Sequence, residues 1–115
     1  MDWTARRCLP CEGGVPPLAA GRAAELLPTL DGWELREGRL HRHFRFRDFA
    51  AAMRFVDGLA ALAEMEGHHP DFSLHDWNRV DVSLWTHAAG GLSENDFILA
   101  GKIDVLPRDP GPPAR

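Results

Sequence analysis

The sequence has no excess of basic residues and no long apolar run. Lysine and arginine total 13 against 17 aspartate and glutamate residues, which gives a formal net charge of -4. Direct nucleic-acid binding needs a positive footprint, and this balance argues against one. A membrane helix needs about 18 or more consecutive apolar residues, and no run in the sequence approaches that length. We therefore expect no direct nucleic-acid binding and no membrane span.

The first seven residues are not followed by the apolar segment of a secretory signal, so we expect a cytoplasmic protein. Cysteine is scarce: the chain has two, Cys8 and Cys11, and they form a single Cys-x-x-Cys. Half a zinc site and a redox pair are two alternatives. Zinc normally takes four ligands, and the chain has no second Cys-x-x-Cys. A redox motif usually sits between a strand and a helix, whereas glycines and prolines follow this one. We favour two reduced thiols in an extended tail.

The length of 115 residues predicts one domain with a single core. Glycine, proline and charge are concentrated in residues 1–17, which predicts a tail or an arm lying on the surface. Residues 18–107 form the expected domain. Residues 108–115 contain three prolines and a glycine, and we expect a C-terminal tail there.

Hydrophobic periodicity within the domain alternates between helix and strand spacing. We expect helices at about 21–27, 48–66 and 93–106, and strand pairs within 33–46 and 72–85. The order is α-β-β-α-β-β-α. This predicts an α+β fold in which a four-stranded antiparallel sheet carries three helices on one face.

Local signals define the ends of the two longer helices. Asp48 is a suitable N-cap for the helix at 48–66, and Gly67 suits the left-handed residue that closes it. Ser93 and Asp96 form a variant of the capping box at the start of the last helix. Turns are expected at Glu37-Gly38 and near Asn78.

Histidine is concentrated after the long helix. His68, His69 and His87 lie with two candidate partner carboxylates, Glu64 and Asp96, between residues 64 and 96. Imidazole has an unperturbed pKa of roughly 6.5 and exchanges protons near neutral pH. All five residues fall at helix ends or strand ends, where loops converge. The pattern predicts a site for proton transfer or a metal.

These residues are also where the sequence resembles a known family. The similarity covers about residues 18 to 106 and is carried by the motifs Glu64, His68-His69-Pro70, Trp77-Asn78-Arg79-Val80, Thr86-His87, Gly91-Leu92-Ser93 and Asp96. In residue identity and order they resemble the pterin-4a-carbinolamine dehydratases. The resemblance implies dehydration of 4a-hydroxytetrahydropterin to quinonoid dihydropterin, in pterin recycling, without a metal or other cofactor.

The resemblance also implies roles for the five residues. His68 and His87 resemble the acid–base pair at the reacting centre, and His69 resembles a group that positions the pterin ring. Glu64 is then expected to orient His68, and Asp96 to anchor the end of the pocket, through His87. Pterin binding is expected to involve His69, Pro70, Trp77 and Thr86.

Other interpretations remain open. Three imidazoles in a compact cluster could bind zinc or iron, although no recognised ligand spacing is present. Each histidine alone could cap a helix or strand end. For His41, His43 and His75 we favour a surface role on alternating strand positions.

Some proteins that resemble this family have a non-catalytic role, and such a role is an alternative function for this chain. One type is a dimerisation partner of an animal homeodomain transcription factor, and another assists assembly of the carbon-fixing carboxylase, Rubisco, in bacterial carboxysomes. Fold and function separate easily. A protein partner of this kind, or an aromatic amino-acid hydroxylase, is therefore an alternative to pterin alone.

The strand at 72–77 ends in a large aromatic and carries no lysine or proline to protect an edge. Pairing with a second copy would give a two-fold dimer. The last helix has more apolar side chains than one face of a small sheet needs, and they could join dimers into a tetramer: Phe97, Ile98, Ile103, Val105 and Leu106. We expect a homodimer or a homotetramer.

Overall fold

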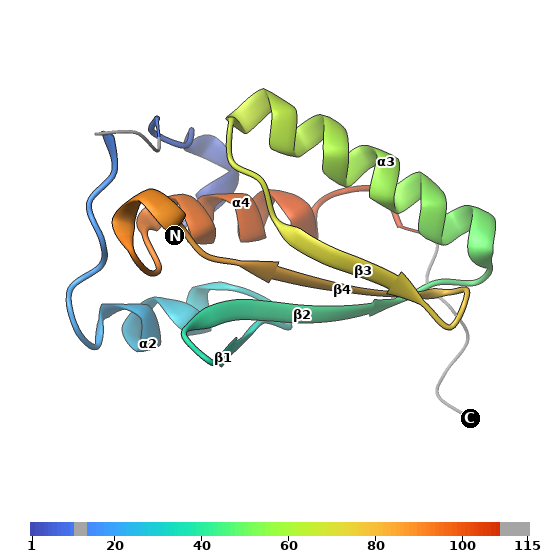
Figure 1. Cartoon of the computed structure of the whole chain (residues 1–115), viewed down its shortest axis with the longest axis horizontal. Coiled ribbons are helices and arrows are strands. Elements are labelled where there is room, and N and C mark those ends of the chain that lie inside the picture. The colour runs from blue at the N-terminus through green and yellow to red at the C-terminus, as the bar shows by residue number, and fades with distance from the viewer. Residues whose placement is uncertain (11–13, 109–115) are drawn as a thin grey trace.

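The computed structural model describes residues 1–10 and 14–108 (Figure 1). The expected α+β order is confirmed. The α-helices are α2 (Arg22–Leu26), α3 (Phe49–Glu66) and α4 (Glu94–Asp104). The strands are β1 (Glu34–Arg36), β2 (Arg39–Arg45), β3 (Asp71–His75) and β4 (Arg79–Leu84). Three short 3-10 turns are η1 (Trp3–Ala5), η2 (Leu27–Thr29) and η3 (His87–Ala89).

The four strands form one antiparallel sheet in the order β1-β2-β4-β3, so β1 and β3 are its edges. Alternation along the central strands gives one apolar and one polar face. Phe44 pairs with Val80 and Leu40 with Leu84, and all four side chains are buried. Helices α3 and α4 cover this face (Figure 1). The other face carries the polar side chains.

Helix α3 begins and ends where the local signals predict. The Asp48 side chain accepts a hydrogen bond from the Ala51 N–H at 2.8 Å, and Gly67 adopts a left-handed φ of 66°. Phe55 packs against Phe44 with 4.7 Å between ring centroids, which joins the helix to β2. Among the described residues, no helix is both long and apolar enough to cross a bilayer.

The β3–β4 hairpin turns one or two residues before the expected position. Asp76 and Trp77 both have positive φ, 50° and 55°. Hairpin turns favour such angles, but a bulky side chain rarely adopts them. Asn78 is buried and donates to the Phe46 carbonyl at 2.9 Å, so the turn is tied to the end of β2. The Trp77 side chain is exposed.

The N-terminal segment is an arm that packs into the domain. Trp3 is only 3% exposed, its ring lies 5.7 Å from that of Phe97, and its indole N–H donates to Thr29 Oγ1 at 2.8 Å. Gly101 of α4 permits this approach, because a Cβ there would lie 2.5 Å from the Trp3 Cβ. Residues 1–10 are therefore more than a surface tail. The expectation for Cys11 lies outside the described residues.

The expected surplus of apolar surface on α4 is wrong. Phe97, Ile98 and Ile103 are each at most 3% exposed. The reason is that α3 packs against α4 on one side while the arm, through Trp3, covers another. Val105, just beyond the helix, is the exposed exception. Burial of these residues leaves α4 with less apolar surface for a tetramer than expected, and the oligomeric state stays a prediction.

Candidate active site

The end of α3 determines where His68 and His69 point. Gly67 reverses the chain, and the His68 N–H donates to the Ala63 carbonyl at 3.2 Å. The His68 ring lies beneath the helix end with 5% of its side chain exposed, whereas the His69 side chain is 64% exposed. Adjacent histidines thus occupy different environments.

Asp96 receives hydrogen bonds at both carboxylate oxygens. As part of the predicted capping box, its Oδ2 accepts from the Ser93 N–H at 2.9 Å. The same oxygen accepts from Thr86 Oγ1 at 2.8 Å. Its Oδ1 lies 2.7 Å from His68 Nε2. The residue is fully buried, so these neighbours take the place of water.

The two side chains are arranged for proton transfer. Oδ2 of Asp96 accepts from two donors, and its Oδ1 faces Nε2 of His68. An N–H at Nε2 would complete the hydrogen bonds of the carboxylate. A buried carboxylate at this distance also stabilises a positively charged imidazole. His68 with Asp96 is equipped to gain and lose a proton.

Thr86 joins the end of β4 to the start of α4. It is 1% exposed, and its Oγ1 also lies 2.7 Å from Ser93 Oγ. Its backbone exchanges hydrogen bonds with Gly91, at 3.1 and 3.3 Å. The hydroxyl expected to contact substrate is engaged with Asp96 and Ser93, so the geometry favours a positioning role.

The partner of Glu64 is His69, with 2.9 Å between Oε2 and Nε2. The sequence led us to expect His68 in that place. Both side chains of the observed pair are largely exposed. The expected pairing assumed helical spacing, which the left-handed Gly67 interrupts. The structure thus gives each of the two carboxylates its own histidine.

His87 begins η3 and is exposed. Its ring centroid lies 4.2 Å from that of Trp85, and Arg39 lies over the same indole at 4.7 Å. Asp96 connects to this region through Thr86, the chain neighbour of His87. Sequence reasoning missed Trp85. An aromatic residue two positions before a histidine at the expected strand end was a usable signal, since alternate residues of a strand share a face. In the structure β4 ends at Leu84, and the contact forms in the segment that follows.

Pro70 and Trp77 lie at opposite ends of β3. Pro70 directly follows His69 and is half-buried, whereas Trp77 is in the hairpin turn. A five-residue strand at about 3.3 Å per residue separates them by roughly 16 Å. Within one chain, the structure brings Pro70 near His69 and does not bring Trp77 there.

The N-terminal arm borders this region. The Cys8 N–H donates to Glu66 Oε1 at 2.9 Å, and Lys102 Nζ lies 2.8 Å from Glu66 Oε2. Burial alone would raise the pKa of Glu66, but these two partners outweigh burial and hold it below its usual value. Asn95 and Leu9 exchange two hydrogen bonds, at 2.9 and 2.8 Å. No local pattern in the sequence predicted these contacts.

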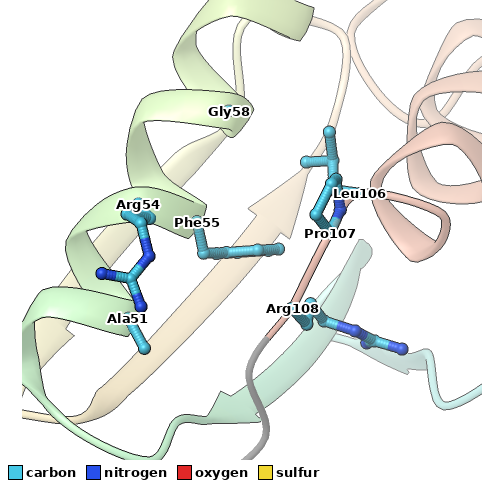
Figure 2. Close-up of a pocket in the computed structure, with 7 residues that line it drawn as sticks. All are labelled: Ala51, Arg54, Phe55, Gly58, Leu106, Pro107 and Arg108. Atoms are coloured by element: carbon cyan, nitrogen blue, oxygen red, sulfur yellow. The ribbon is translucent and has the colours of Figure 1, made fainter.

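A separate pocket of about 420 Å³ lies along the N-terminal half of α3 (Figure 2). Its lining residues come from α3 and from the segment after α4: Ala51, Arg54, Phe55, Gly58, Leu106, Pro107 and Arg108. The predicted site residues do not line it. This pocket and the histidine cluster are therefore at different ends of α3.

The fold and the His68–Asp96 pair define a small α+β protein equipped for acid–base chemistry. A sequence model of the family described as pterin 4 alpha carbinolamine dehydratase matches residues 16–106. The chain belongs to this family of hydro-lyases. A protein of Nitrosomonas europaea is 49% identical over 91% of this chain and 93% of its own. One of Stenotrophomonas maltophilia is 51% identical over 87% of each chain. Both are provisionally named pterin-4-alpha-carbinolamine dehydratases.

Two solved structures have the same fold. One is described as a transcriptional coactivator/pterin dehydratase from Brucella melitensis, with 37% identity, a TM-score of 0.71 and coverage of 76% of this chain and 95% of that one. The other is described as a pterin dehydratase-like protein that is a RuBisCO assembly factor in the alpha-carboxysome. It has 27% identity, a TM-score of 0.55 and coverage of 64% and 87%.

Proposed function

We propose that this protein dehydrates a 4a-hydroxytetrahydropterin to the quinonoid dihydropterin. The observation that carries the proposal is the buried His68–Asp96 pair, held by Thr86 and Ser93 where α3, β4 and α4 meet. Family membership supports the substrate class.

The reaction needs one acid and one base. The hydroxyl on C4a leaves as water after it takes a proton, and the lone pair of N5 helps to expel it. N5 then loses its own proton to a base, so one water is released and protons balance. A well-placed acid or base contributes about 10²–10⁴-fold.

His68 and His87 are the proposed acid–base pair. His68 has Asp96 behind it to hold positive charge, and a small open part of its ring to meet substrate. His87 is exposed beside Trp85 and can move its proton to and from solvent. We assign Thr86 to positioning Asp96.

His69 and Glu64 are the proposed ring-positioning pair. Both side chains are exposed and hydrogen-bonded to each other, so a pterin can displace or share that contact. Pro70 follows and supplies a partly apolar surface. Trp77 is too far along β3 to join them in the same chain, and a role in pterin binding requires its approach from a second copy.

The test is turnover of enzymatically generated 4a-hydroxytetrahydropterin by purified protein. We expect His68→Gln and His87→Gln each to lower kcat about 100-fold or more, and His69→Gln mainly to raise KM. His43→Gln, on the polar sheet face, is the matched control and should turn over normally. Wild-type protein that does not speed loss of the 4a-hydroxy species would refute the proposal.

A second candidate is a protein-assembly role on the same scaffold. Both solved relatives carry such a description, coactivator in one and RuBisCO assembly factor in the other. This chain also exposes three large apolar side chains on α3, namely Phe49, Met53 and Met65. Stoichiometric capture of a protein partner from the native cell, together with absent pterin turnover, would favour this role over catalysis.

A further inference from the structure

The polar face of the sheet gathers a second group of histidines. His41 and His43 lie two residues apart on β2, so they share a face. Asp81 of β4 pairs with His43 in register, and His75 lies on the neighbouring β3. The three histidines that we expected to be ordinary surface residues therefore surround one carboxylate.

The distances show that these side chains converge. His43 Nδ1 is 2.8 Å from Asp81 Oδ1, and His75 Nε2 is 2.5 Å from Asp81 Oδ2. His41 Nε2 approaches Oδ1 at 3.3 Å. The rings of His43 and His75 have centroids 6.0 Å apart. Both carboxylate oxygens thus face imidazole nitrogens.

One ligand atom from each of His43, His75 and Asp81 lies within 4.8 Å of the others. In a tetrahedral zinc site with bonds of about 2.0–2.2 Å, ligand atoms lie roughly 3.3–3.6 Å apart. Small rotations of these side chains would bring their ligand atoms from the observed spacing to that of a zinc site. We propose that His43, His75 and Asp81 bind a divalent transition-metal ion, with Zn²⁺ as the preferred ion.

The ligand types determine this preference. Imidazole nitrogen suits zinc, nickel, copper and cobalt, whereas magnesium and calcium need mostly oxygen ligands. His41 stands next to Asp81 and is placed to become a fourth ligand, or to hold a water in that position. Glu34 lies 3.4 Å from His41 Nδ1 and can orient that ring, as carboxylates do behind metal-bound histidines.

The carboxylate is suited to this role. Its two oxygens face imidazole nitrogens of His43 and His75 at 2.8 and 2.5 Å, so each oxygen is already directed at a neighbouring ligand. The side chains of His43, His75 and Asp81 are 39%, 41% and 30% exposed, so an ion can reach them from solvent.

The site is distinct from the proposed catalytic one. His43 and Asp81 alternate with the buried Phe44 and Val80, so they lie on the sheet face opposite α3 and α4. Figure 1 shows both helices on the other face. His68 directly follows α3, and Asp96 lies in α4. Zinc binding here joins β2, β3 and β4 through their side chains. It should raise the thermal stability of the hairpin without occupying the pterin-binding residues.

Equilibrium titration of metal-free protein with ZnCl₂ tests the proposal. We expect one Zn²⁺ per chain, displacement of visible Co²⁺ absorption by Zn²⁺, and broadened or shifted imidazole NMR signals from His43 and His75. Asp81→Asn and His43→Gln should each weaken binding about tenfold or more. Mg²⁺ should neither bind nor compete.

Two controls localise the ion. Ser83→Ala changes the same sheet face without removing a ligand, and His69→Gln removes an exposed histidine that also pairs with a carboxylate. Both should bind zinc like the wild type. Circular dichroism in EDTA verifies that each variant is folded. Unchanged zinc affinity in Asp81→Asn, or NMR shifts confined to His68, His69 and His87, would overturn the proposal.

Discussion

Two adjacent histidines belong to different histidine–carboxylate pairs, and burial gives the two pairs unequal weight. His68 and Asp96 are within 2.7 Å and almost fully enclosed, whereas His69 and Glu64 are within 2.9 Å and largely exposed. An exposed pair gains little because water screens it and side-chain entropy opposes it. A buried pair that loses one partner leaves an uncompensated charge or dipole.

We expect Asp96→Asn to lower the free energy of unfolding by about 3–5 kcal/mol, because it removes a buried charge partner. Glu64→Gln is the matched change at the exposed pair and should cost about 0–1 kcal/mol. Urea denaturation followed by tryptophan fluorescence measures both. Equal effects of the two substitutions would contradict the distinction between the pairs.

His75 supplies a pH-dependent prediction. Hydrogen bonds to Asp81 and then Asp76 raise its pKa above the ordinary 6.5, against a small opposing effect of burial. Protonated His75 is thus favoured in the folded chain. Its stabilising contribution should be complete below about pH 6.5 and disappear as pH rises through the higher folded value.

NMR titration of the imidazole in metal-free protein measures this pKa directly. Asp81→Asn should move the midpoint down, because it removes the principal partner while Asp76, His43 and the facing Arg79 remain. His75→Gln should accordingly lower stability more at pH values below the wild-type midpoint than above it. A midpoint at or below the ordinary value in the wild type would contradict the structure.

At the scale of elements, local signals were sufficient for most boundaries. Asp48, Gly67 and Ser93 each act on backbone groups within a few residues, so their roles were readable from sequence. The pairing of Glu64 with His69 could not be read from the sequence. A single left-handed residue changes the direction of the chain after α3, and that change redirects both following histidines.

Contacts between distant segments were beyond the sequence pattern. Trp3 lies in a glycine- and proline-rich segment, and its burial depends on the space left at Gly101, near the other end of the chain. Likewise, the register of β2, β4 and β3 decides that His43, Asp81 and His75 meet. Periodicity reveals which face a residue takes but not its neighbour across strands.

Two glycines, one within α3 and one at its C-terminal cap, offer a matched pair of substitutions. Gly67→Ala places a side chain at a φ of 66°, so we expect a loss of about 1 kcal/mol. Gly58→Ala lies within the helix, where a Cβ meets Leu106 at an ordinary 3.7 Å, and should gain about 0.5–1 kcal/mol. Thermal or urea unfolding resolves the opposite signs. Stabilisation by Gly67→Ala would contradict the observed cap.

At the scale of the whole molecule, β3 is an edge strand, as the sequence predicted. Phe72 on this strand is exposed. An unprotected edge invites pairing with a second copy, and we expect a homodimer through β3. With α4 covered by the arm, nothing on that helix supports a further interface.

Light scattering behind a sizing column should give at least twice the 12.8 kDa mass of one chain. Phe72→Lys places a charge on the edge and should shift the population toward monomer. Val105→Lys changes a more exposed apolar residue away from the edge and should leave the mass unchanged. A wild-type mass near that of one chain at micromolar concentration would refute the dimer.

Asp96 closes the first turn of α4 and, with the same carboxylate, holds His68. Fraying of that one helical turn would therefore disconnect the proposed proton-transfer unit before the core opens. Under mild denaturant, activity should vanish ahead of the global transition, and the amides around Ser93 should exchange with solvent early. On this expectation, the lifetime of the activity depends on one helical turn as well as on the hydrophobic core.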